Sequence, residues 1–323
     1  MLAIEAETTG GPEVLRVIER PVRDPGPGEI RIRHTAIGLN FIDTYQRTGL
    51  YPVPMPAVLG LEAAGIVEAV GEDVTRFKEG DRAAYANGPI GAYSEAHCVP
   101  ATRAVHVPDA VSLETAAAAM LKGMTAEFLA RRCFPVRAGQ TILVHAAAGG
   151  VGQILTQWAT HLGATVIATA GGEEKLALAR SVGAKHTIDY RTEDVAARVR
   201  EFTDGKGVPV AYDSVGAATF EGTLGSLAPR GMFVSFGNAS GPVPPFAPLR
   251  LQQGGSLFFT RPTLFHYVAT TEELDASAAA LFEVISSGAV RVAIGQTFPL
   301  KEARAAHEAL EGRRTTGSTL LIP

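Results

Sequence analysis

The stretch TILVHAAAGGVGQ (residues 141–153) decides the fold, because an apolar run rich in β-forming residues passes directly into a glycine-rich loop. Apolar residues then recur at steps of three and four, at Val151, Ile154, Leu155, Trp158 and Leu162. This spacing predicts a helix with one apolar face. A strand, a glycine loop and a helix in this order are the context in which a helix N-terminus presents free N–H groups to the pyrophosphate of a dinucleotide.

The glycine loop leaves two interpretations. Gly149, Gly150 and Gly152, with Val151 among them, allow a tight turn and a close approach of the backbone to a pyrophosphate. The spacing is AxxGGxG and not GxGxxG, so a turn needed only for packing a strand against a helix is the alternative. We expect the cofactor role, because further candidate strands follow.

Downstream of this loop, strand-like and helix-like segments alternate. With TILVHAA, the strand-like segments ATVIATA, HTIDY, VPVAYDSVG, GMFVSFG and GSLFFT make six candidate strands. Helices are expected over EEKLALARSVGA and TEDVAARVREFT, whereas a proline-rich loop, GPVPPFAP, joins the last two strands without a clear helix. This alternation predicts an α/β domain with a doubly wound parallel sheet.

The chain before this region has a different pattern. Short alternating runs interrupted by Gly and Pro, such as EIRIRHTAIGLN and AAGIVEAVG, indicate a β-rich, barrel-like unit. The last segment, with helices over TEELDASAAALFEVISSG and KEARAAHEALEG and a final STLLIP, is expected to return to that unit. A length of 323 residues also favours two domains. We predict a first domain from residues 1–122 and 263–323, and a second from residues 123–262.

Composition excludes several classes of protein. The net charge of −4 argues against a nucleic-acid partner, because phosphate binding depends on clustered Lys and Arg. The sequence has no window of about 18 uninterrupted apolar residues, so we expect no membrane span. The N-terminal residues carry no export signal, and only Cys98 and Cys133 are present, so we expect a cytoplasmic protein without disulfides.

The end of the second predicted strand indicates which nicotinamide cofactor binds. An NAD site places Asp or Glu there, on the ribose hydroxyls. This chain has Ala170, Gly171 and Gly172 instead, and Lys175 follows shortly. A missing acid with a nearby cation suits a 2′-phosphate and therefore NADPH, although Lys175 could be a solvated residue of the helix that follows.

Several long motifs together resemble one family. They include GGPEVL (10–15), AIGLNFIDTYQRTGLYP (36–52), LGLEAAGIVEAVG (59–71), HAAAGGVGQ (145–153) and SFGNASG (235–241). The chain resembles the medium-chain dehydrogenase/reductase superfamily, and within it the zinc-independent, zeta-crystallin-like NADPH:quinone oxidoreductases. The resemblance implies a GroES-like catalytic domain, a Rossmann domain, direct hydride transfer to a quinone without a metal, and a homodimer. The dimer would form along the last sheet strand, which carries Phe258 and Phe259.

The resemblance also raises the question of Glu62, an acid in the otherwise apolar run LGLEAAGIVEAVG. Zinc-dependent members of the superfamily have a His ligand where this chain has Leu61, and a Cys ligand around Asn40. A catalytic zinc needs about three protein ligands, so we expect no metal. Glu62 is then expected to be a hydrogen-bonded structural remnant and not a general base; the alternative is a strand end that points into solvent.

By the same resemblance, the segment NFIDTYQRTGLYP lines the acceptor site, and its polar residues Asn40, Asp43, Tyr45 and Tyr51 are the candidate catalytic residues. Packing is the alternative role for the two tyrosines. Further cofactor contacts implied are Asn40, Thr125, Tyr190, Ser214, Phe236, Gly237, Thr260, Arg261 and Arg313. Arg313 lies in RRTTGS, which is also typical of an exposed turn. Two other functions remain open: reduction of activated C=C bonds in enals or enones, and a nucleotide-binding structural or RNA-binding crystallin-like role.

Overall fold

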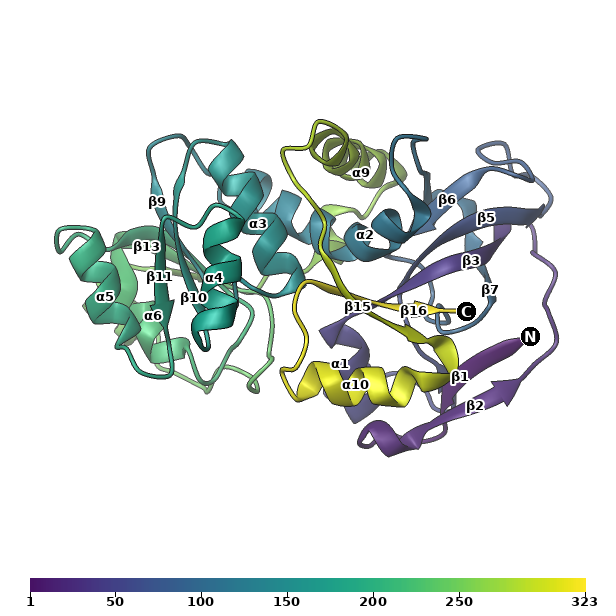
Figure 1. Ribbon diagram of the computed structural model, residues 1–323, viewed down its shortest axis with the longest axis horizontal. Coiled ribbons are helices and arrows are strands. Elements are labelled where there is room, and N and C mark those ends of the chain that lie inside the picture. Colours follow the sequence, from purple (N-terminus) through teal and green to yellow (C-terminus); the bar gives the residue numbers. More distant parts are fainter. The chain divides into compact units, whose positions relative to one another are not determined.

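The computed structural model describes the whole chain, residues 1–323, and divides it into two compact units. Unit 1 comprises Met1–Met124, Val268–Ser286 and Val292–Pro323, and unit 2 comprises Thr125–Tyr267 and Ser287–Arg291. Figure 1 shows both units and labels their helices and strands where there is room.

Unit 2 is built on a six-stranded parallel sheet. Its strands are β9 (Thr141–Val144), β10 (Thr165–Ala170), β11 (His186–Asp189), β12 (Val208–Asp213), β13 (Leu227–Ser235) and β14 (Phe258–Thr260). The spatial order is β11-β10-β9-β12-β13-β14, so the winding direction reverses between β9 and β12. This is the doubly wound sheet that the alternating segments predict, and ligands of such sheets bind at the carboxyl ends of the strands near the reversal.

The helices of unit 2 connect and cover these strands. They are α3 (Gly150–His161), α4 (Glu173–Ser181), α5 (Val195–Phe202), α6 (Phe220–Ser226), α7 (Leu249–Gln253) and α8 (Leu264–Tyr267). The helix α3 packs on β9 and β10, and α5 packs on α6. The short helix α7 was not expected from the sequence; it follows the proline-rich loop because prolines fix φ but cannot continue a helix. The packed interior includes Leu143, Ile167, Ile188, Phe220 and Phe233.

Unit 1 contains two antiparallel-rich sheets. The strands β1 (Leu2–Ala6), β2 (Leu15–Glu19) and β4 (Ala57–Val58) form a small sheet in the order β2-β1-β4. The larger sheet has β3 (Glu29–Leu39), β5 (Glu62–Val70), β6 (Arg82–Tyr85), β7 (Ala96–Pro100), β8 (Ala104–His106), β15 (Ile294–Pro299) and β16 (Ser318–Ile322). The strand β16 pairs with β3, so the C-terminal strand returns to the N-terminal sheet as expected.

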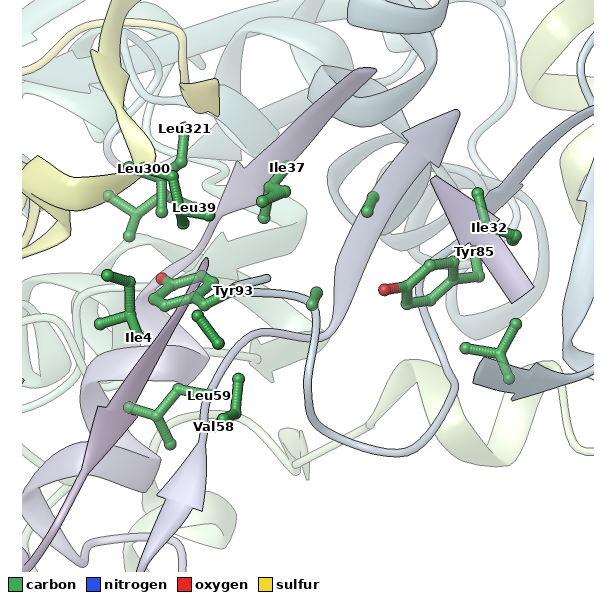
Figure 2. Close-up of a cluster of buried hydrophobic side chains, with 14 of the residues drawn as sticks. Ile4, Ile32, Ile37, Leu39, Val58, Leu59, Tyr85, Tyr93, Leu300 and Leu321 are labelled. Atoms are coloured by element: carbon green, nitrogen blue, oxygen red, sulfur yellow. The ribbon is translucent and has the colours of Figure 1, made fainter. Parts of the chain in front are cut away.

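Four helices belong wholly or partly to unit 1: α1 (Phe41–Thr48), α2 (Leu113–Phe128), α9 (Thr271–Ser286) and α10 (Ala303–Glu311). The helix α2 extends from unit 1 into unit 2 and continues as a π-helical turn, Leu129–Cys133. The core between the sheets of unit 1 is apolar, and Figure 2 shows the Tyr93 ring within this cluster. None of the helices has the length and apolar character needed to cross a bilayer.

Candidate cofactor and acceptor sites

The N-terminus of α3 can receive an anion. Its cap residue is Gly149, which has extended backbone angles and provides no side-chain cap. Within α3, the first N–H group that bonds to the chain is that of Gln153, which donates to Gly149 O at 2.9 Å. The Gly149 N–H, before the helix, donates to Ala146 O. The preceding N–H groups of α3 therefore lie open at the positive end of the helix dipole, as a pyrophosphate requires. The glycine loop packs tightly as well, since a Cβ at Gly152 would lie 2.3 Å from Ala146 O.

A buried polar chain, which the sequence did not reveal, fixes the strand ends around this loop. His145 contacts Thr169 Oγ1 through Nδ1 (3.0 Å) and Thr223 Oγ1 through Nε2 (2.9 Å). Thr223 Oγ1 lies 2.9 Å from Asp213 Oδ2. Burial lowers the pKa of His145, which favours the neutral form of the ring. The other carboxylate oxygen of Asp213 accepts two backbone N–H groups from the loop that begins at Ser214.

The turn after β10 consists of glycines with a positively charged side chain beside them, which suits an anionic group of a ligand. A Cβ at Gly171 would lie 2.6 Å from Arg191 Nε and 2.7 Å from Tyr190 Oη, so a larger residue at this position would displace these two exposed side chains. Gly172 has a φ of 88°, in the left-handed region. Arg191 is exposed and was not among the predicted site residues. A local feature of the sequence could have identified Arg191, because it is a cation directly after Tyr190 at the end of a strand.

An acid beside this turn, Asp189, binds the backbone. Asp189, the last residue of β11, accepts the Gly172 N–H at 3.1 Å through one oxygen and the Arg191 N–H at 3.0 Å through the other. It therefore holds the two loops in place. Lys175 lies in the first turn of α4, half-buried, three residues after Gly172. Together with the open N-terminus of α3, this arrangement fits a phosphorylated dinucleotide.

The remaining predicted cofactor residues of unit 2 lie at or after strand ends, except for Thr125. Arg261 Nη1 donates to Ser235 Oγ at 3.1 Å and to Gly237 O at 2.9 Å, so it ties the loops after β13 and β14 together. Thr260 is the last residue of β14. Ser214 and Phe236 are half-buried after β12 and β13, Thr125 is buried on α2, and Arg313 is exposed after α10 in unit 1.

Asn40 is the N-cap residue of α1 and is held by carboxylates at both its backbone and its side chain. Its backbone N–H donates to Asp43 Oδ2 at 2.9 Å. Its side-chain Nδ2 donates to Glu62 Oε2 at 2.7 Å. Glu62 is fully buried, so the alternative that this acid points into solvent is wrong. The expectation of a hydrogen-bonded Glu62 is confirmed.

Asp43 belongs to a second buried chain, which runs along α1. Tyr93 Oη donates to Asp43 Oδ2 at 2.8 Å, and His307 Nε2 lies 3.0 Å from Tyr93 Oη. Arg47 Nη1 donates to His307 Nδ1 at 2.9 Å and pairs with Glu311 at its outer end. Burial raises the pKa of Asp43 to about 7 and lowers that of His307 to about 3. Asp43 is fully buried, and one of its carboxylate oxygens holds the backbone N–H of Asn40.

Tyr45 and Tyr51 form an aromatic pair after Asn40. Their ring centroids are 5.3 Å apart in an edge-to-face arrangement, and the Tyr51 N–H donates to Tyr45 O at 3.0 Å. Tyr45 is buried and Tyr51 half-buried. Near the positions of the zinc ligands in related enzymes, Leu61 is buried, and the structure holds no group of three His, Cys, Asp or Glu side chains suited to a metal ion.

A β-rich unit together with a Rossmann-type sheet unit defines a dehydrogenase of the medium-chain class. Two family models match the chain accordingly. The alcohol dehydrogenase GroES-like domain matches residues 26–109, and the zinc-binding dehydrogenase domain matches residues 150–283.

Similar proteins show which family within this class the chain belongs to. A quinone oxidoreductase of Pseudomonas aeruginosa is 56% identical over 99% of both chains. The crystal structure of Escherichia coli quinone oxidoreductase complexed with NADPH is 48% identical, with a TM-score of 0.99 over 100% of both chains. A 2-haloacrylate reductase of a Burkholderia species is 45% identical over 100% of this chain and 99% of its own. The chain belongs to the quinone oxidoreductase family of the medium-chain dehydrogenase/reductase superfamily.

Proposed function

We propose that the protein reduces quinones with NADPH. The observation that carries this proposal is the turn at Gly171 and Gly172, where the ribose-binding acid is absent and the Arg191 guanidinium lies beside the glycines. Similarity to the Escherichia coli quinone oxidoreductase complexed with NADPH supports both the cofactor and the acceptor class.

Each cofactor contact follows from the chain's own groups. The open N–H groups at Gly150, Val151 and Gly152 bind the pyrophosphate. Arg191 and Lys175 bind the 2′-phosphate, with Tyr190 beside them. We also assign cofactor contacts to Thr125, Ser214, Phe236, Gly237, Thr260, Arg261 and Arg313, as predicted from the sequence.

At the acceptor end, Asn40 contacts the nicotinamide end of NADPH, and Tyr45 and Tyr51 face the quinone. Bound NADPH supplies the hydride. A neutral tyrosine hydroxyl orients a quinone oxygen by donating a hydrogen bond and, with a reference pKa of about 10, does so without ionising. Asp43 holds the backbone of Asn40. We propose that no zinc takes part, because Leu61 and Asn40 occupy the positions of metal ligands in related enzymes and a leucine side chain cannot ligate.

Assembly and location are part of the proposal. The strand β14 forms one edge of the unit 2 sheet, and Phe258 on it is 57% exposed. Apolar edge strands are normally paired or covered, so we propose a homodimer along β14. The two cysteines are free thiols, which suits a reducing compartment and therefore the cytoplasm.

A second acceptor class is favoured by one observation, the 45% identity to a 2-haloacrylate reductase. Such an acceptor carries an activated C=C bond. Oxidation of NADPH measured with a panel of quinones, 2-haloacrylates and enones tests the proposal. Quinones should give the highest kcat/KM. A preference for the unsaturated acids would assign the enzyme to the second class, and binding of NADPH without oxidation by any acceptor would leave only a nucleotide-binding role.

A further inference from the structure

The Asn40 side chain has no hydrogen-bond donor left for a ligand. Its Nδ2 donates to Glu62 Oε2 at 2.7 Å and to Gly38 O at 3.3 Å. An ionised carboxylate and a carbonyl oxygen only accept, so the nitrogen, and not the oxygen, must face both groups. An amide nitrogen carries two hydrogens. The remaining capacity of Asn40 is therefore confined to Oδ1, which also faces the Asp43 N–H in the capping box of α1.

Glu62 is fixed in turn by groups far away in the sequence. The Leu121 N–H donates to Glu62 Oε1 at 2.6 Å, and Lys122 Nζ donates to Oε2 at 3.1 Å. The two side chains of this ion pair are 0% and 7% exposed. Gly38 lies opposite Glu62 in the pairing of β3 with β5, and a Cβ there would lie 2.0 Å from Glu62 Oε2. The carboxylate therefore occupies a space that admits no other side chain.

We propose that Glu62, held by Lys122 and the Leu121 N–H, is a positioning residue that fixes the orientation of the Asn40 amide, so that Asn40 meets its ligand only through its oxygen. This inference rests on the proposed function, in which Asn40 contacts the nicotinamide end of NADPH. The carboxamide NH₂ of a nicotinamide is a donor and suits this oxygen.

The hydrogen-bond donors and acceptors at this site also distinguish the roles of the acceptor-site residues. A quinone has carbonyl oxygens, which only accept, and so does Asn40 Oδ1. Asn40 is therefore a cofactor contact and not a quinone contact. The donor to the quinone must be another group, and the Tyr45 and Tyr51 hydroxyls can supply it.

The variant that tests this is Glu62→Gln, which keeps the shape of the side chain. Its amide oxygen can still accept the Leu121 N–H, which turns its NH₂ toward Asn40. The Asn40 amide must then rotate and present nitrogen to the ligand. We expect NADPH to bind roughly tenfold or more weakly, the effect of one hydrogen bond replaced by a mismatch. Binding of 2′,5′-ADP, which lacks the nicotinamide, should not change.

Two controls distinguish positioning from simple destabilisation. Glu68→Gln removes a partly exposed carboxylate from the same strand, where it pairs with Arg31 and Arg33, and should leave NADPH binding unchanged. In an Asn40→Ala background, Glu62→Gln should add no further loss. An equal loss of NADPH affinity in both backgrounds would overturn the proposal.

The side-chain ¹⁵N–¹H resonances of Asn40 provide a readout without cofactor. Glu62→Gln should move them, whereas Glu68→Gln should not; unmoved resonances in Glu62→Gln would contradict the proposal. If Glu62→Gln does not fold, the side-chain resonances of Asn40 in the wild-type protein provide the test. Both amide protons are already bonded, so NADPH should shift them little, and a large shift of both would overturn the assignment. Absence of quinone-dependent NADPH oxidation by the wild type would reject the proposed function while the resonance test still reports the amide orientation.

Discussion

Replacing Arg191 with alanine should weaken NADPH binding and leave NADH binding unchanged. The guanidinium lies against the turn at Gly171, where a Cβ would come within 2.6 Å of its Nε. Hydrogen bonds to charged groups contribute about 1.5–3 kcal/mol. Because Arg191 is exposed, the low end applies, and about 1.4 kcal/mol corresponds to a tenfold change in Kd. We therefore expect a loss of about tenfold for NADPH.

The assay is fluorescence titration of Arg191→Ala, Lys175→Ala and the double variant with NADPH and with NADH. Independent contributions would give the double variant a loss of roughly a hundredfold for NADPH, as the sum of two such contacts. Lys206→Ala removes a cation that is exposed in the loop before β12, and serves as the control for net charge. Equal losses for NADPH and NADH in Arg191→Ala, or no loss for either, would refute the assignment of the 2′-phosphate site.

Other properties can be tested in the same protein. Burial holds the folded pKa of His307 at about 3, below the unfolded value near 6.5, so this residue should lower the free energy of unfolding by about 2 kcal/mol on going from pH 6.5 to pH 5. The raised pKa of Asp43 acts oppositely, since its stabilising proton is lost as pH rises toward 7. Denaturant titrations at both pH values should therefore show that, relative to the wild type, acidification from pH 6.5 to pH 5 lowers the free energy of unfolding less in His307→Asn and more in Asp43→Asn; unchanged dependences would contradict these pKa directions. Tyr45→Phe and Tyr51→Phe should each slow quinone reduction by about tenfold or less, the effect of one neutral hydrogen bond, and a thousandfold fall would reveal a general acid. Sedimentation should give a dimer at micromolar concentration and a weaker one for Phe258→Glu; a monomeric wild type would count against the β14 interface.

The features that the sequence predicts are those with local signals. The strands of unit 2 are short apolar runs, and the glycine loop stands directly between β9 and α3, so the doubly wound sheet could be derived from neighbouring residues alone. The return of the C-terminal segment to unit 1, where β16 pairs with β3, was predicted only from the pattern of helical segments and a final strand in that segment. The helix α7 was missed, because the prolines before it dominate the local pattern.

The partners of Glu62 could not be predicted from the residues around it. Asn40, Leu121 and Lys122 lie 22, 59 and 60 positions away, and only the fold brings them together. For the same reason the chain from His145 through Thr223 to Asp213 has no sequence signature. Isolated polar residues in apolar surroundings have many compatible roles, and their contacts decide among them.

The central claim is an NADPH-dependent quinone reductase whose cofactor preference comes from the turn after β10. Its most direct test is the ratio of kcat/KM for NADPH to that for NADH with one simple quinone, such as 1,4-benzoquinone, followed by nicotinamide absorbance. We expect turnover with a ratio of about ten or more, the effect of a charge-assisted phosphate contact. A ratio near one, or no quinone-dependent oxidation of NADPH, would contradict it.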